Sequence, residues 1–232
     1  MRCLILALLC SMVPQIAGGA ERPAAIVVGF LGGMVRHDDV VHAEVQVASR
    51  LQRDYSSAVQ VRMFENRRGQ QALSEVRRLL DTDHDGALSA DEKRDARIAI
   101  YGHSWGASET VTMARALGKA GVAVLLTVQV DSVTKLGQDD ESIPSNVARA
   151  INFYQRNGWL RGRARIRAMD AARTQILGNL RYDYRTSSVS LEGFPWYARL
   201  FMRPHIEIES DPRVWEQVEA LIRTALGPPT AR

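Results

Sequence analysis

The chain has 232 residues, of which 46% are hydrophobic and 24% are charged, and its net charge is +4. That composition supplies the core of a medium-sized domain and argues against a disordered chain. Its two cysteines, Cys3 and Cys10, both lie in the first ten residues. These figures exclude a disulfide scaffold, a cysteine-based zinc site and a polytopic membrane protein.

The first twenty residues have the pattern of a secretory signal peptide. Arg2 gives a positive start, residues 3–13 form an apolar run, and the small residues 17–20 precede a polar stretch. The apolar run is shorter than the roughly 20 residues that a membrane-spanning helix needs. We therefore predict cleavage near Ala20 and export to the periplasm or the medium. The mature chain, residues 21–232, is predicted to form a single domain without a transmembrane segment.

Apolar runs and helical patterns alternate along the rest of the chain. Strand patterns lie at residues 25–28, 58–64, 98–101 and 122–130, and helical patterns lie at 40–51, 70–80, 107–117 and 212–226. This alternation favours an α/β fold of three layers, a mostly parallel sheet with helices on both faces. Residues 132–204 are less regular. There, residues 146–154 fit a helix or a strand, and the alternation over 163–167 fits an edge strand.

A G-x-S-x-G pattern occurs at residues 102–106, where Ser104 is the serine. It follows a strand pattern and precedes a helical one, which is the strand, sharp turn and helix in which a nucleophilic serine is held. The backbone N–H of Trp105 would then donate to an oxyanion. The alternative is an ordinary glycine-rich turn between a strand and a helix.

A nucleophilic serine needs a base, and the base needs an acid that orients it. His205 is the one histidine that follows Ser104 in the chain, so it is the candidate base, with a structural histidine as the alternative. Asp131 closes the apolar run 122–130 and is the candidate acid, because functional groups gather at the carboxyl ends of parallel strands. A cap or turn role stays open for Asp131. The rival acids are Asp139, Asp140, Asp183 and Glu192.

The second oxyanion donor is expected in the glycine-rich residues 29–33, which follow the first predicted strand. Glycines there would let backbone N–H groups approach a substrate closely. The predicted donor is the N–H of Phe30 or Leu31.

Residues 81–92 match an EF-hand calcium loop at every constrained position. The expected ligands are the side chains of Asp81, Asp83, Asp85, Ser89 and Glu92 and the backbone carbonyl of Ala87, with Gly86 at the sharp turn. Because there is one such loop and its outgoing helix is short, we expect a fixed structural Ca²⁺ ion and not a calcium switch. The alternative is a solvated acidic turn.

Arginines are concentrated between residues 156 and 185, at Arg156, Arg161, Arg163, Arg165, Arg167, Arg173, Arg181 and Arg185. The chain has only 3 lysines among its 30 basic residues, so the preference for arginine is global. We therefore interpret the stretch as a solvated face and not as a nucleic-acid site. Four aromatic residues fit either a substrate wall or the core: Trp159, Phe194, Trp196 and Tyr197.

The elbow at 102–106, the strand that ends at Asp131 and the late His205 resemble the α/β-hydrolase superfamily, in particular its lipase- and thioesterase-like members, over roughly residues 24–226. The resemblance implies a Ser-His-Asp triad, an oxyanion hole and cleavage of a small carboxylic ester or thioester. No motif for an organic cofactor is present. Two features depart from the family: many members place the acid one strand later, and the calcium loop is not part of the usual pattern. The alternative is a non-catalytic calcium-binding protein on the same scaffold.

Overall fold

The computed structural model describes residues 25–56, 58–186 and 189–228, so the predicted signal peptide lies outside the described residues. Within those ranges, no helix combines the length and the apolar character needed to cross a membrane.

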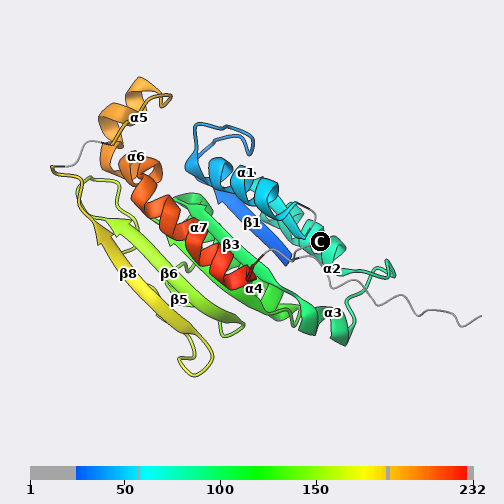
Figure 1. The fold of residues 1–232 in the computed structure, drawn as a ribbon. Coiled ribbons are helices and arrows are strands. Elements are labelled where there is room, and N and C mark those ends of the chain that lie inside the picture. Colours follow the sequence, from blue (N-terminus) through cyan, green and yellow to red (C-terminus); the bar gives the residue numbers. More distant parts are fainter. Residues whose placement is uncertain (1–24, 57, 187–188, 229–232) are drawn as a thin grey trace, which may run out of the picture.

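A six-stranded sheet occupies the middle of the molecule (Figure 1). Its order is β2-β1-β3-β4-β6-β8, and every neighbouring pair is parallel. The strands are β1 (Ala25–Leu31), β2 (Val59–Glu65), β3 (Ile98–His103), β4 (Val124–Val130), β6 (Val147–Gln155) and β8 (Gln175–Tyr182). The short strands β5 (Ser142–Ile143) and β7 (Arg167–Ala168) form a separate parallel pair.

Helices cover both faces of the sheet, which confirms the predicted three-layer α/β fold (Figure 1). One face packs against α1 (Ala43–Tyr55), α6 (Arg203–Ser210) and α7 (Pro212–Leu226). The other face packs against α2 (Gly69–Leu80) and α4 (Trp105–Lys119). Two short helices, α3 (Ala90–Asp95) and α5 (Trp196–Phe201), lie in the connections.

β1, β3 and β4 are mostly apolar runs because each of them is buried on both faces. In β1, Val27 faces the α1 and α7 side, whereas Ile26 and Val28 face the α2 and α4 side. β1, β3 and β4 are neighbours and run in the same direction, so their carboxyl ends meet at one edge. The residues that follow them are therefore brought together at this edge.

Differences from the predicted elements are concentrated in residues 132–204. The ambiguous segment 146–154 is the strand β6, and the alternation at 163–167 is not an edge strand, since only Arg167–Ala168 pair there as β7. The edge strand on this side of the sheet is β8, which was not predicted. Gly178 and Asn179 interrupt its apolar pattern, and an edge strand tolerates them because only one side of it is paired.

Candidate active site

The turn between β3 and α4 holds Ser104 at φ 57° and ψ −125°, a backbone conformation that residues with side chains rarely adopt. The backbones of β1 and α4 approach closely at this turn. A Cβ atom at Gly106 would lie 2.2 Å from the carbonyl oxygen of Phe30, and one at Gly102 would lie 2.7 Å from the same oxygen. Only glycine fits at these two positions, so the G-x-S-x-G spacing follows from the packing.

Three predicted residues, distant in sequence, form one hydrogen-bonded chain. The Nε2 atom of His205 lies 2.8 Å from Ser104 Oγ, and its Nδ1 atom lies 2.7 Å from Asp131 Oδ2. Ser104 follows β3, Asp131 follows β4, and His205 is on α6. The side chains are nearly enclosed, with Ser104 7%, His205 1% and Asp131 0% exposed. This is the geometry in which an imidazole can take the proton of a serine hydroxyl.

The carboxylate of Asp131 is held by further donors. Its Oδ1 accepts hydrogen bonds from the backbone N–H groups of Gln155 at 3.1 Å and Gly162 at 2.9 Å. Its Oδ2 accepts a third from the side-chain amide of Gln155 at 2.8 Å, in addition to its contact with His205. These donors fix the orientation of the carboxylate that in turn orients the imidazole ring.

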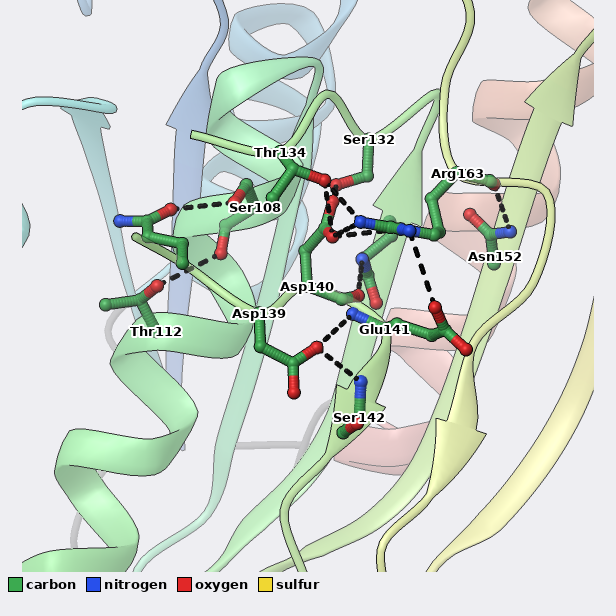
Figure 2. A network of polar contacts seen from close by, with 12 residues as sticks. Ser108, Thr112, Ser132, Thr134, Asp139, Asp140, Glu141, Ser142, Asn152 and Arg163 are labelled. Atoms are coloured by element: carbon green, nitrogen blue, oxygen red, sulfur yellow. Dashed lines mark hydrogen bonds and ion pairs between the residues drawn. The ribbon is translucent and has the colours of Figure 1, made fainter. Parts of the chain in front are cut away.

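The rival acid Asp140 is buried in a different network, which Figure 2 shows. Its carboxylate accepts hydrogen bonds from Ser132 at 2.6 Å and Thr134 at 2.8 Å. The guanidinium of Arg163 donates to the same carboxylate at 2.8 and 3.0 Å. The network fixes the segment after β4, directly beyond Asp131.

The other rival acids also have partners away from His205. Asp139 accepts from the backbone N–H groups of Glu141 and Ser142 (Figure 2), and Asp183 pairs with Arg185. Glu192 makes no hydrogen bond with His205 among the described residues. Asp131 is therefore the carboxylate that the described fold brings to the imidazole.

His103, the residue before the serine, contacts both the backbone and the ring of His205. Its Nε2–H donates to the backbone carbonyl of His205 at 3.2 Å, and the two ring centroids are 4.5 Å apart. Burial lowers the pKa of His103 to about 4, against the opposing effect of nearby Glu209, whose Oε2 lies 3.3 Å from Nδ1. Sequence reasoning missed both contacts. The available signal was the spacing of four residues between His205 and Glu209, which places them on one face of a helix.

A cavity of about 620 Å³ opens beside Ser104. Of the predicted oxyanion donors, Trp105 lines this cavity, whereas Phe30 and Leu31 do not. Both belong to β1, which extends three residues beyond the predicted strand. All of its residues are buried, up to its end at Leu31. The backbone that reaches the cavity is instead Gly32 and Gly33, and a Cβ atom at Gly32 would lie only 2.8 Å from Ser104 Cβ.

The wall of the cavity is mostly apolar. The lining includes Val41, Phe194, Tyr197, Met202 and Ile206, several of which come from α5, α6 and the segment before them. Two of the four aromatic residues singled out from the sequence, Phe194 and Tyr197, thus lie at the cavity. The other two, Trp159 and Trp196, are exposed and do not line it.

The acidic loop lies between α2 and α3, and α3 leads into β3. One carboxylate oxygen from each of Asp81, Asp83 and Asp85 lies within 4.8 Å of the others, and Gly86 has φ +85° at the expected sharp turn. None of the three aspartates forms an ion pair with a described basic residue. Their arrangement therefore fits a hard cation bound by oxygen ligands.

The remaining loop residues are arranged differently. The carboxylate of Glu92 accepts hydrogen bonds from the backbone N–H groups of Thr82 at 2.6 Å and Ser89 at 2.9 Å. Ser89 caps α3 and receives the N–H of Glu92 at 3.3 Å. Glu92 thus closes the loop through a capping box, and the carboxylates that gather are those of the three aspartates.

Half of the eight arginines between residues 156 and 185 form ion pairs within the chain: Arg163, Arg167, Arg181 and Arg185. Their carboxylate partners are Asp140, Glu141 and Asp183. Such internal pairing agrees with the interpretation of the stretch as a solvated face.

No protein-family model matches the sequence, and no curated protein matches it as a relative. Solved structures with a similar fold include a protein assigned to the hydrolases of the α/β superfamily from Xanthomonas campestris pv. campestris, at 13% identity and TM-score 0.45 over 86% of this chain and 99% of the other. A thermostable esterase from Pseudomonas putida shares 12% identity at TM-score 0.46, over 90% of this chain and 74% of the other. A cutinase-like protein from Cryptococcus sp. shares 13% identity at TM-score 0.47, over 91% of this chain and 98% of the other. At these identities the similarity is one of fold alone.

Proposed function

We propose that the chain is a serine hydrolase that cleaves a carboxylic ester or thioester. The observation that carries this proposal is the chain of contacts from Ser104 Oγ through His205 to Asp131, at 2.8 and 2.7 Å. Support also comes from the backbone at Ser104, whose positive φ holds the hydroxyl at the start of α4 beside the cavity.

In the proposed reaction, Ser104 Oγ attacks the substrate carbonyl carbon while its proton passes to His205 Nε2. The tetrahedral intermediate collapses, the bond to the leaving alkoxide or thiolate breaks, and His205 gives its proton to that group. A water molecule, deprotonated by His205, then attacks the acyl-serine. The bond between the acyl carbon and Ser104 Oγ breaks, His205 returns its proton to that oxygen, and the acid is released. Asp131 orients the imidazole and stabilises its charged form in both steps.

The oxyanion would be held by backbone donors at the serine. Trp105 N–H is the first, since Trp105 opens α4 and lines the cavity. For the second, the contacts favour the backbone of Gly32 and Gly33 over the predicted Phe30 or Leu31. Preorganised donors of this kind act on the charge that develops in the transition state.

The apolar wall of the cavity supports a substrate with a hydrophobic acyl or alcohol part. Phe194, Met202 and Ile206 line this cavity together with Ser104 and His205. Pockets that are mostly apolar with a few convergent polar groups are typical of small-molecule sites.

The proposal includes a structural Ca²⁺ ion at residues 81–92. The three clustered aspartates would hold it, together with the carbonyl of Ala87. The loop pattern also names the side chains of Ser89 and Glu92 as ligands, and these would have to turn from the capping box of α3 to reach the ion. We also propose export, on the pattern of the first twenty residues alone. Mass spectrometry of the protein recovered from the periplasm or medium would locate the cleavage site.

The experiment for the catalytic proposal is labelling with a fluorophosphonate probe in the presence of calcium, followed by peptide mapping. We expect the label on Ser104, and we expect Ser104→Ala and His205→Ala to abolish it in folded protein. Ser49→Ala, which removes an exposed hydroxyl on α1, is the matched control and should label like the wild type. Absence of label on folded, calcium-loaded wild type would contradict the proposal and favour a non-catalytic calcium-binding protein.

A further inference from the structure

A second polar cluster borders the cavity, and the proposed reaction does not use it. We define the α1–α6 cluster as His42, which precedes α1, Glu44 in the first turn of α1, and Glu209 on α6. One ligand atom from each of these residues lies within 4.8 Å of the others. His42 and Glu209 line the cavity, so small ions can reach the cluster from it.

Glu44 is the member of the cluster whose carboxylate is buried without a partner in the described part of the chain. Its side chain is 0% exposed, and neither carboxylate oxygen has a hydrogen-bond donor among the described residues. A buried carboxylate without donors or a cation is strongly unfavourable. Burial and the neighbouring Glu209 raise the pKa of Glu44 to about 8.

Glu209 is surrounded by groups that could share a cation with it. The Nδ1 atom of His42 contacts Glu209 Oε1, and the Nδ1 atom of His103 lies 3.3 Å from Glu209 Oε2. The Nε2–H of His103 is committed to the carbonyl of His205, so its neutral ring turns a lone pair toward the carboxylate. The carboxylates of Glu44 and Glu209 and the ring of His42 thus each place one potential ligand atom within one small volume.

We propose that the α1–α6 cluster binds one divalent transition-metal ion of the zinc class, with His42, Glu44 and Glu209 as ligands. One imidazole and two carboxylates are a set that Zn²⁺ accepts, whereas Ca²⁺ takes oxygen ligands. A divalent ion would neutralise both carboxylates. A single shared proton would satisfy one oxygen of Glu44 and leave the other without a partner, whereas a cation can engage both.

The position of this site gives the ion a structural consequence. Glu209 lies four residues after His205 on α6, and Glu44 and His42 lie at the start of α1. The ion would therefore link α6, which carries His205, to α1, which packs on the same face of the sheet. This inference does not require the proposed hydrolase activity, because it concerns binding at residues outside the triad.

The test is zinc binding by the full chain after removal of metals with a chelator, in saturating calcium so that the loop at 81–92 is filled. Isothermal titration with ZnCl₂ should show one equivalent of zinc, and the melting temperature should rise. Glu44→Gln keeps the shape but removes one charge, so it should weaken zinc binding at least about tenfold. Glu216→Gln, an exposed glutamate on α7, is the control and should bind zinc like the wild type.

If Glu44→Gln does not fold, cobalt in the wild type replaces the variant as the test. Bound Co²⁺ should give visible absorption bands that one equivalent of Zn²⁺ removes. The inference is overturned if the wild type binds no zinc, or if Glu44→Gln binds zinc like the wild type.

Discussion

Ser104 is held at a positive φ by the close approach of three backbone segments around it. β1, the turn and the first turn of α4 meet where Gly102 and Gly106 would each bring a Cβ atom within 2.7 Å of other backbone atoms. Strained conformations of this kind persist only where the surrounding packing enforces them. The serine is therefore positioned by the sheet and by α4, and not by its own side-chain contacts.

The first prediction at this scale concerns Gly106. In Gly106→Ala the new methyl group would meet the backbone of β1, which cannot move without disturbing the centre of the sheet. We expect a loss of about 4 kcal/mol or more in the free energy of unfolding, measured with urea. Gly178→Ala, on the edge strand β8, meets only a flexible Leu180 side chain at 3.2 Å and should cost about 1 kcal/mol or less. Equal losses in the two variants would contradict this account.

A second prediction concerns the acid. Asp131→Asn should keep the fold but lower kcat by on the order of 10³- to 10⁴-fold, because an amide cannot stabilise the charged imidazole or fix its tautomer. Asp139→Asn is the matched control, since Asp139 lies on the same segment and bonds only Arg115 and its own neighbours. The rate at which each variant hydrolyses an activated ester measures its kcat. A normal rate in Asp131→Asn with a loss in Asp139→Asn would reassign the acid.

The residues of the candidate triad could be predicted because chain order and strand ends restrict them. Ser104 is marked by its glycines, His205 by being the last histidine, and Asp131 by the end of an apolar run. The contacts of His103 with His205 and Glu209 were not predicted, because they depend on how α6 packs against β3. The four-residue spacing of His205 and Glu209 indicates only that they share one face of a helix. The packing of α6 against β3 is a tertiary property without a local pattern.

At the scale of elements, the start of α7 depends on one buried carboxylate. Asp211 caps the helix by accepting the N–H of Arg213 at 2.9 Å, and it also accepts the hydroxyl of Tyr184 at 2.9 Å. α7 in turn packs Val214, Val218 and Ile222 against the sheet. This carboxylate therefore joins the last helix to the segment that follows β8.

Asp211→Ala should lower the free energy of unfolding by about 2–3 kcal/mol, since it removes a helix cap and leaves a buried hydroxyl without its acceptor. Tyr184→Phe removes only the hydroxyl and should cost about 1 kcal/mol. Urea unfolding of both variants separates the two contributions. A larger loss in Tyr184→Phe than in Asp211→Ala would contradict the capping role.

Prediction of the elements succeeded where apolar residues form a continuous or alternating run, or where a helix has one apolar stripe. The four strand patterns correspond to β1, β2, β3 and β4, and the four helical patterns to α1, α2, α4 and α7. It failed for β8, where Gly178 and Asn179 interrupt the apolar pattern, and for the short helices α5 and α6. α5 exposes Trp196, Leu200 and Phe201, so it lacks the single apolar stripe by which a helix is recognised.

At the scale of the whole molecule, the calcium proposal predicts a ligand-dependent stability. The loop joins α2, through α3, to β3, so an ion bound there would stabilise the folded chain by mass action. At about 100 times its dissociation constant, calcium should raise the melting temperature by about 5–10 °C relative to chelator. Asp83→Asn should remove most of this shift, and Asp91→Asn, whose carboxylate pairs with Arg94, should retain it. A wild-type melting curve that is the same in chelator and in calcium would contradict the site.

The wholly parallel pairing of the six-stranded sheet also has a consequence for how quickly the chain folds. No two of its described strands form a hairpin. Each pair of strands can therefore form only after the crossover segment between them has brought the two strands together. β1 and β3, for example, pair across more than sixty residues, from Ile26 with Ile98 onward. The entropy cost of closing such a loop comes before the strand contacts that offset it can form. Folding is therefore slow, and strand edges stay unpaired for longer. We therefore expect refolding on a scale of milliseconds to seconds and a dependence of its yield on protein concentration.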